Sequence, residues 1–198
     1  INEMDRVRKA EFAFSFLPQQ NMNLRMFTSY NRFAFFDNYE FLPSSGNSHA
    51  TSNQFDVAET GFLYTWNIRE KVMLLGNQRI SLGTKFPKIT LRAVKGWDNI
   101  FEGDYDYYRL NMTINQSFQI RGFGKLQLQA SGGTTIGDVP VTLLQNAPGT
   151  GRNWNLVVPN SFETMRPAEF FSTHQAALFS RLTFLPIKSN LSWTEPLI

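Results

Sequence analysis

The sequence predicts an all-β, antiparallel fold of the outer-membrane β-barrel type, on three observations. Along residues 105–137, polar and apolar side chains alternate over two long arms joined by a short turn. Successive side chains of a strand point to opposite faces, so this pattern predicts an amphipathic hairpin. Each arm is longer than the roughly five or six residues usual in soluble sheets, and matches the roughly 9–11 residues of a tilted membrane-crossing strand. The polar positions carry mostly amides and hydroxyls, which suit the interior of a barrel.

The alternation also predicts which side chains face lipid and which face the lumen, with Gln116 as the one polar residue among the apolar positions. The predicted lipid-facing residues are Leu110, Met112, Ile114, Phe118, Ile120, Leu126, Leu128, Leu178 and Leu182. The predicted lumen-facing residues are Asn111, Thr113, Asn115, Ser117, Gln119, Gln127 and Gln129. Four aromatic residues before the hairpin are predicted to form an interfacial girdle at headgroup depth: Trp97, Tyr105, Tyr107 and Tyr108.

Bulk composition agrees with a strand-crossing membrane protein and excludes several other classes. The chain is 42% hydrophobic, yet its mean hydropathy is −0.28, as expected where every second residue is polar. No stretch approaches the roughly 18–20 apolar residues of a membrane helix. The net charge of +3 comes from scattered basic residues, so no nucleic-acid partner is expected. The absence of Cys excludes disulfides, thiolate metal sites and Cys nucleophiles.

The rest of the chain predicts further strands on either side of the hairpin. Residues 69–88 are either a long turn or a ragged short strand, because Gly76, Gly83 and Pro87 interrupt their alternation. The first and last residues both look cut, so residues 1–198 are interpreted as a single β-barrel region that is incomplete at both ends. About seven to eight strands of a larger barrel are then covered. Beside the two hairpin arms, strands are predicted at residues 10–17, 24–36, 55–68, 88–96 and 170–184, and an eighth near Asn190.

The connections alternate between short and long. This is the pattern of an outer-membrane barrel, whose short turns are periplasmic and whose long loops are outside. Residues 69–88 do not fit, since their connection should be short. The length of residues 138–169 predicts a functional or folded loop. The short connections are predicted at 18–23, 121–124 and 185–189, and the long ones at 37–54, 97–105 and 138–169.

No catalytic, cofactor or metal site is predicted. His49 and His174 have neither a carboxylate nor a nucleophile at motif spacing. Glu102, Asp104 and Asp106 lie close together in a loop, but they lack the full spacing of a Ca²⁺-binding oxygen cage. The sequence therefore predicts a protein that is not an enzyme and that carries no cofactor.

Several motifs between residues 79 and 190 resemble a known family. Val94-Lys95-Gly96 ends a strand, an aromatic segment follows at 104–108, and residues 132–144 and 165–170 complete the pattern. Together they resemble the C-terminal barrel of a Bacteroidetes outer-membrane family of unknown function, whose members carry a carboxypeptidase-regulatory-like domain ahead of the barrel. Gly133 stands where the family usually has Lys, and Val141 where it usually has Tyr.

The resemblance implies a place and a role. That family's barrel is similar to the surface-antigen superfamily, which assembles or translocates outer-membrane proteins. It implies a protein of the bacterial outer membrane that acts in envelope biogenesis or export, or as a scaffold of an outer-membrane complex. Expected partners are outer-membrane lipid, lipopolysaccharide and other outer-membrane proteins. Two alternatives stay open: a passive or substrate-specific pore with residues 138–169 as its plug or gate, and a soluble ligand-binding β-barrel.

Overall fold

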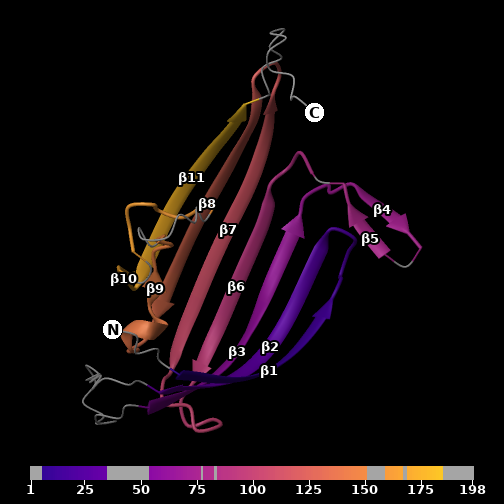
Figure 1. The fold of residues 1–198 in the computed structure, drawn as a ribbon. Helices are drawn as coiled ribbons and strands as arrows, with labels where there is room; N and C mark the ends of the chain where they lie inside the picture. Colours follow the sequence, from indigo (N-terminus) through magenta and orange to yellow (C-terminus); the bar gives the residue numbers. More distant parts are fainter. Residues whose placement is uncertain are drawn as a thin grey trace, which may run out of the picture.

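The computed structural model is an antiparallel sheet of seven long strands in the order β1-β2-β3-β6-β7-β8-β11 (Figure 1). It describes residues 6–34, 54–76, 78–82, 84–150, 159–166 and 169–184. Every neighbouring pair of strands in this sheet is antiparallel. The predicted all-β, antiparallel class is therefore confirmed.

Each of the seven strands lies where the alternation predicts one. The largest difference is at β8, which runs five residues beyond the predicted alternation that ends at Ser131. The strand expected near Asn190 lies outside the described residues. The strands are β1 (Arg6–Phe16), β2 (Met22–Ala34), β3 (Gln54–Asn67), β6 (Lys88–Trp97), β7 (Tyr107–Ile120), β8 (Gly124–Ile136) and β11 (His174–Phe184).

Several short elements lie outside the seven-stranded sheet. β4 (Val72–Leu75) and β5 (Gln78–Ser81) form a small hairpin that projects from the connection between β3 and β6 (Figure 1). The ambiguous segment 69–88 thus contains a separate hairpin, and at Lys88 it enters the sheet strand β6. After β8 come a 3₁₀ turn, η1 (Val141–Leu143), and a two-residue pairing of β9 (Gln145–Asn146) with β10 (Phe171–Ser172). Within the described ranges, no helix has the length and apolarity needed to cross a membrane.

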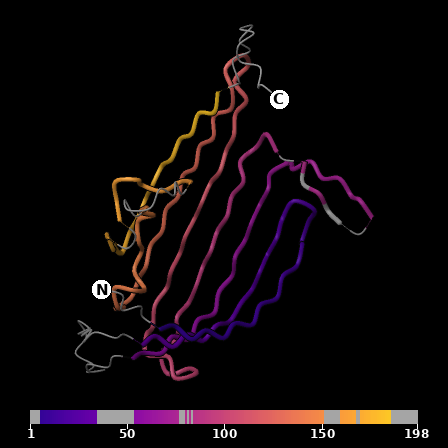
Figure 2. Tube along the Cα trace, viewed as in Figure 1, coloured from indigo at the N-terminus to yellow at the C-terminus, as the bar shows by residue number. Residues whose placement is uncertain are grey.

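The sheet is open and has two distinct ends. β1 and β11 lie at opposite sides of it (Figure 2), and they do not pair in the described part of the chain. The turns at 17–21 and 121–123 lie at one end, called here the turn end. The β4–β5 hairpin also leaves the sheet at this end. The segments at 98–106 and 137–150 lie at the other, called the loop end.

The strand register gives the sheet one apolar and one polar face, because directly paired residues share a face. The row Phe16, Leu24, Tyr64, Leu91, Met112, Gly132 and Ala176 crosses all seven strands on the apolar face. The next row on the polar face reads Ser15, Arg25, Leu63, Arg92, Asn111, Gly133 and Gln175.

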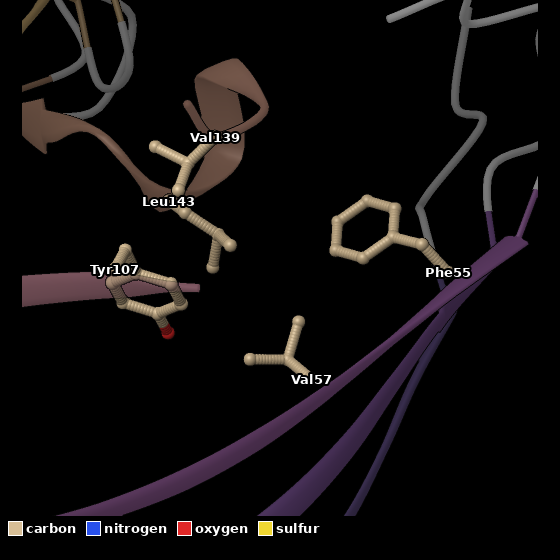
Figure 3. Close-up of a cluster of buried hydrophobic side chains, with 5 residues drawn as sticks. All are labelled: Phe55, Val57, Tyr107, Val139 and Leu143. Atoms are coloured by element: carbon tan, nitrogen blue, oxygen red, sulfur yellow. The ribbon is translucent and has the colours of Figure 1, made fainter. Parts of the chain in front are cut away.

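The buried hydrophobic core lies on the polar side of the sheet, at the loop end. Figure 3 shows its side chains converging from strands β3 and β7 and from the segment around η1. The apolar face has no such cover, and Phe12 and Leu178 on it are 74% and 70% exposed. The sheet therefore buries its polar side at one end and leaves its apolar side open. The core residues are Phe55, Val57, Tyr107, Val139 and Leu143.

Candidate functional site

The two sets of residues predicted to face lipid and lumen fall on opposite faces. The register places all nine predicted lipid-facing residues on the apolar face and all seven predicted lumen-facing residues on the polar face. Gln116 belongs to the apolar face, as the sequence indicates. Its Nε2 donates a hydrogen bond to the Lys85 carbonyl oxygen at 2.7 Å. The Gln116 side-chain amide thus bonds to the backbone of the segment that precedes β6.

The structure divides the four residues of the predicted aromatic girdle into two pairs. Trp97 and Tyr108 lie on the apolar face at the loop end, where the Lys95 ammonium lies 4.0 Å from the Tyr108 ring centroid and pairs with Asp106. Tyr107 is completely buried on the polar face, and Tyr105 packs edge-on against the core residue Phe55. The prediction for Tyr105 and Tyr107 is therefore wrong. Tyr107 lies two residues before Arg109 and thus continues the polar set.

A glycine lets Tyr107 reach across a strand. Glu59, Gly96 and Tyr107 form one row over β3, β6 and β7. A Cβ atom on Gly96 would overlap the Tyr107 ring, so the ring lies directly over the β6 backbone. From there its hydroxyl donates a hydrogen bond to Glu59 Oε1, two strands away. The absence of a side chain at Gly96, in the Val94-Lys95-Gly96 motif, thus provides the space in which this ring lies.

Glu59 is the centre of a compensated charged network. Arg109 Nη2 lies 3.3 Å from Glu59 Oε1, and its guanidinium carbon lies 5.4 Å from the Tyr107 ring centroid. Ser29 Oγ donates to Glu59 Oε2 at 3.3 Å, and Asn31 Nδ2 donates to Ser29 Oγ at 3.4 Å. A buried carboxylate needs both a counter-charge and hydrogen-bond donors, and Glu59 has both.

The segment after β8 folds back onto the polar face. Asn111 Nδ2 donates to Gln145 Oε1 at 2.7 Å, and Gln145 Nε2 donates to Thr135 Oγ1 at 3.0 Å. Gly133 lies beneath this contact, and a Cβ atom there would overlap both the Asn111 and Gln145 amides. The absence of a side chain at Gly133 therefore leaves room for Gln145 to bond to the sheet here.

The later part of the same loop also contacts the polar face. Asn160 Nδ2 donates to Gln129 Oε1 at 2.8 Å, and the rings of Phe162 and Phe179 lie 4.8 Å apart. The loop is tied to itself by an isolated bridge between Gly149 and Phe162. For the residues that the structure describes, the predicted folded loop at 138–169 is confirmed. We call residues 137–150 and 159–166 the inward loop.

The titratable residues singled out in the sequence bind different partners. Asp104 accepts a hydrogen bond from the Asp56 backbone N–H at 2.7 Å, while Glu102 pairs with Arg32. His174 Nδ1 lies 2.9 Å from Thr134 Oγ1. Across the described ranges, no three His, Asp or Glu side chains gather in a way that could hold a metal ion. His49 lies outside the described residues.

Sequence reasoning missed a hollow of about 1130 Å³ at the turn end. Side chains of the polar face form one wall, the base of the β4–β5 hairpin forms another, and Asn160 of the inward loop borders it. We call it the basic hollow, because six basic residues line it: Arg69, Lys71, Lys85, Lys88, Lys125 and Arg181. The described lining residues include no carboxylate.

Comparison with known proteins identifies a family. The model of the "Family of unknown function (DUF5686) C-terminal domain" matches residues 7–141. The match includes the N-terminal third, which the motif resemblance over residues 79–190 had left out, and it ends before residues 165–170. No curated protein matches the chain. Because the match covers more than half of the sequence, the chain belongs to the DUF5686 family of unknown function, in its C-terminal domain.

Proposed function

We propose that this chain forms part of the wall of an outer-membrane β-barrel, and that it acts without catalysis in envelope biogenesis or export. The observation that carries the proposal is the pair of faces. Seven strands present a continuous, uncovered apolar face, and the opposite face is polar and partly covered by the chain's own loop. In a barrel, the apolar face would meet lipid outside and the polar face would meet a water-filled lumen inside.

Strand length supports crossing a bilayer. β7 has 14 residues, which at about 3.3 Å per residue rise roughly 45 Å along the strand. A tilt of about 40° leaves roughly 35 Å along the barrel axis, enough for a hydrocarbon core about 30 Å thick. Lipid does not tolerate the two open edges, so the proposal requires further strands, from this protein or from neighbours, to close the barrel.

Charged side chains on the apolar face lie at the loop end, where a headgroup layer would begin. Arg32 there makes two hydrogen bonds to the Asp56 carboxylate, at 2.7 and 2.8 Å. Trp97 Nε1 donates to Thr60 Oγ1 at 2.7 Å, and Lys95 lies beside the Trp97 and Tyr108 rings. Aromatic rings and long basic side chains favour this depth. We infer that the loop end lies outside the cell and the turn end in the periplasm.

The first test is heat-modifiability of the full-length protein, extracted in detergent from isolated outer membranes. We expect unheated and boiled samples to migrate differently, since a closed barrel resists unfolding in the gel. Recovery in the soluble fraction without such a shift would overturn the proposal and favour the soluble ligand-binding barrel.

A pair of substitutions tests the assignment of the faces. Ile114→Arg should lower the free energy of unfolding in liposomes by about 2–4 kcal/mol, because the side chain would meet lipid near the midplane. Thr113→Arg, one residue away on the polar face, should have a smaller effect. Equal losses in the two variants, measured by urea unfolding, would contradict the assignment.

The inward loop favours a second candidate function, a substrate-specific pore. It contacts the polar face at Asn111, Gln129, Thr135 and Phe179, so it would occupy part of a lumen. The chain has no Cys, so Asn160→Cys and Gln129→Cys can be joined by a short bis-maleimide without side reactions. If the loop is a gate, joining the two cysteines should suppress single-channel current that the unjoined variant shows. No current from either form argues against a pore.

A further inference from the structure

We propose that the basic hollow at the turn end binds a ligand carrying several phosphate groups. The inference goes beyond the proposed function and is independent of it, because it rests on the side chains of the polar face and the β4–β5 connection. A failed heat-modifiability test would leave it standing.

The first argument is uncompensated charge. None of the six basic residues of the hollow makes an ion pair within the described part of the chain. Glu70, which lies between Arg69 and Lys71 in the sequence, accepts a hydrogen bond from Asn67 Nδ2 at 3.1 Å and does not line the hollow. Five basic residues elsewhere do have acidic partners in the structure: Lys9, Arg25, Arg32, Lys95 and Arg109.

The second argument is like-charge proximity. Lys125 pairs with Thr183 and Arg181 pairs with Gln127, so the two cations are diagonal neighbours on one face of β8 and β11. Diagonal positions on a sheet lie roughly 7–8 Å apart, so both cations belong to the same small area of the face, and like charges repel. A bound polyanion would relieve this repulsion.

The third argument is that the wall opposite the sheet is fixed. Thr84 Oγ1 donates to the Ile68 carbonyl oxygen at 2.6 Å, and the Leu82 N–H donates to the Lys71 carbonyl oxygen at 2.8 Å. The Arg69 guanidinium lies 5.0 Å from the Phe86 ring centroid. These contacts therefore fix the backbone at the base of the hairpin and the position of the Arg69 guanidinium before any ligand arrives. A site arranged in advance loses less conformational entropy on binding.

The size and lining of the basic hollow indicate a ligand with several phosphate groups and not one small anion. The volume of about 1130 Å³ is at or above the upper end of the roughly 300–1,000 Å³ common for ligand sites. Basic residues on two walls cannot all reach one phosphate. Arg matches phosphate oxygens with its planar fork, and Lys contacts them as a point charge. Amides of Gln119, Gln127 and Gln129 add uncharged donors between them.

The test uses the full-length protein in a zwitterionic detergent and two probes, measured by isothermal titration calorimetry. One is inorganic tripolyphosphate, and the other is mixed micelles containing cardiolipin, a lipid with two phosphate groups, with phosphatidylcholine micelles as the blank. Binding of tripolyphosphate indicates a soluble ligand, and binding of cardiolipin alone indicates a lipid headgroup. Both support the site. If neither probe binds, the proposal is overturned.

Variants separate the hollow from bulk charge. Lys125→Gln/Arg181→Gln should weaken binding by about tenfold or more, because charge-assisted hydrogen bonds are lost. Lys85→Gln/Lys88→Gln changes other residues of the hollow and should do the same. The matched control is Arg6→Gln/Arg8→Gln on the exposed edge strand β1, which changes net charge equally. A loss of affinity in the control as large as in the hollow variants would overturn the proposal.

Discussion

The two ends of the polar face are built in opposite ways. At the loop end, buried Glu59 is matched by Arg109, hydroxyl donors surround it, and an apolar cluster packs beside it. At the turn end, six basic side chains surround an open hollow without an acidic partner among its described lining residues. The polar face therefore has a buried, paired carboxylate at one end and, within the described part of the chain, unpaired basic side chains at the other. Compensated charge stabilises the fold, whereas uncompensated charge around a cavity indicates a ligand.

The largest effect should come from removing the central ring of the loop end. Tyr107→Ala should lower the free energy of unfolding by about 3–5 kcal/mol, since a fully buried aromatic side chain leaves a cavity. Tyr108→Ala is the matched control: the same change, one residue along, on the opposite face, where the side chain is 57% exposed. Urea unfolding should separate the two variants clearly. Similar losses would show that the loop end is not packed as described.

An intermediate effect should follow from neutralising Glu59. Glu59→Gln should destabilise the protein by about 1–3 kcal/mol, because Arg109 loses its counter-charge and buried donors lose a carboxylate acceptor. Glu11→Gln removes a carboxylate that pairs with Lys9 and Arg25 on the exposed edge of the sheet. There the loss should stay below about 1 kcal/mol. A loss at Glu59 no larger than that at Glu11 would remove the distinction between compensated burial and surface pairing.

The smallest effect should come from the turn end. Without ligand, Lys125→Gln/Arg181→Gln should change the free energy of unfolding by no more than about 0.5 kcal/mol, or raise it slightly, because exposed like charges are removed. The measurement is the same urea titration, in phosphate-free buffer. A marked loss of stability would mean that these cations support the fold, and the comparison between the two ends would fail.

Strict alternation of polar and apolar residues made most of the architecture predictable. It located the seven strands, and it assigned Leu110, Asn111 and their neighbours to opposite faces, because a strand has a period of two. The same period already placed Tyr107 with Arg109 and Asn111. Grouping it with the nearby aromatic residues by type produced the error.

What alternation could not predict depends on register and on chain reversal. The basic hollow takes Arg69, Lys88, Lys125 and Arg181 from separate segments, and nothing local in the sequence brings them together. Likewise, the length of residues 138–169 predicts a folded loop, but its direction depends on contacts with residues distant in the sequence, among them the contact over Gly133. That glycine reads in the sequence as an ordinary departure from a motif.

The absence of a side chain at Gly96 has a consequence for how the strands align during folding. A strand that slips by two residues keeps its polar side chains on the polar face, so alternation alone does not prevent the error. Such a slip would bring Val94 or Asp98 under the Tyr107 ring in place of Gly96. The native alignment leaves room for the ring over Gly96 and brings its hydroxyl to Glu59. The absence of a side chain at Gly96 therefore favours the native register of β3, β6 and β7.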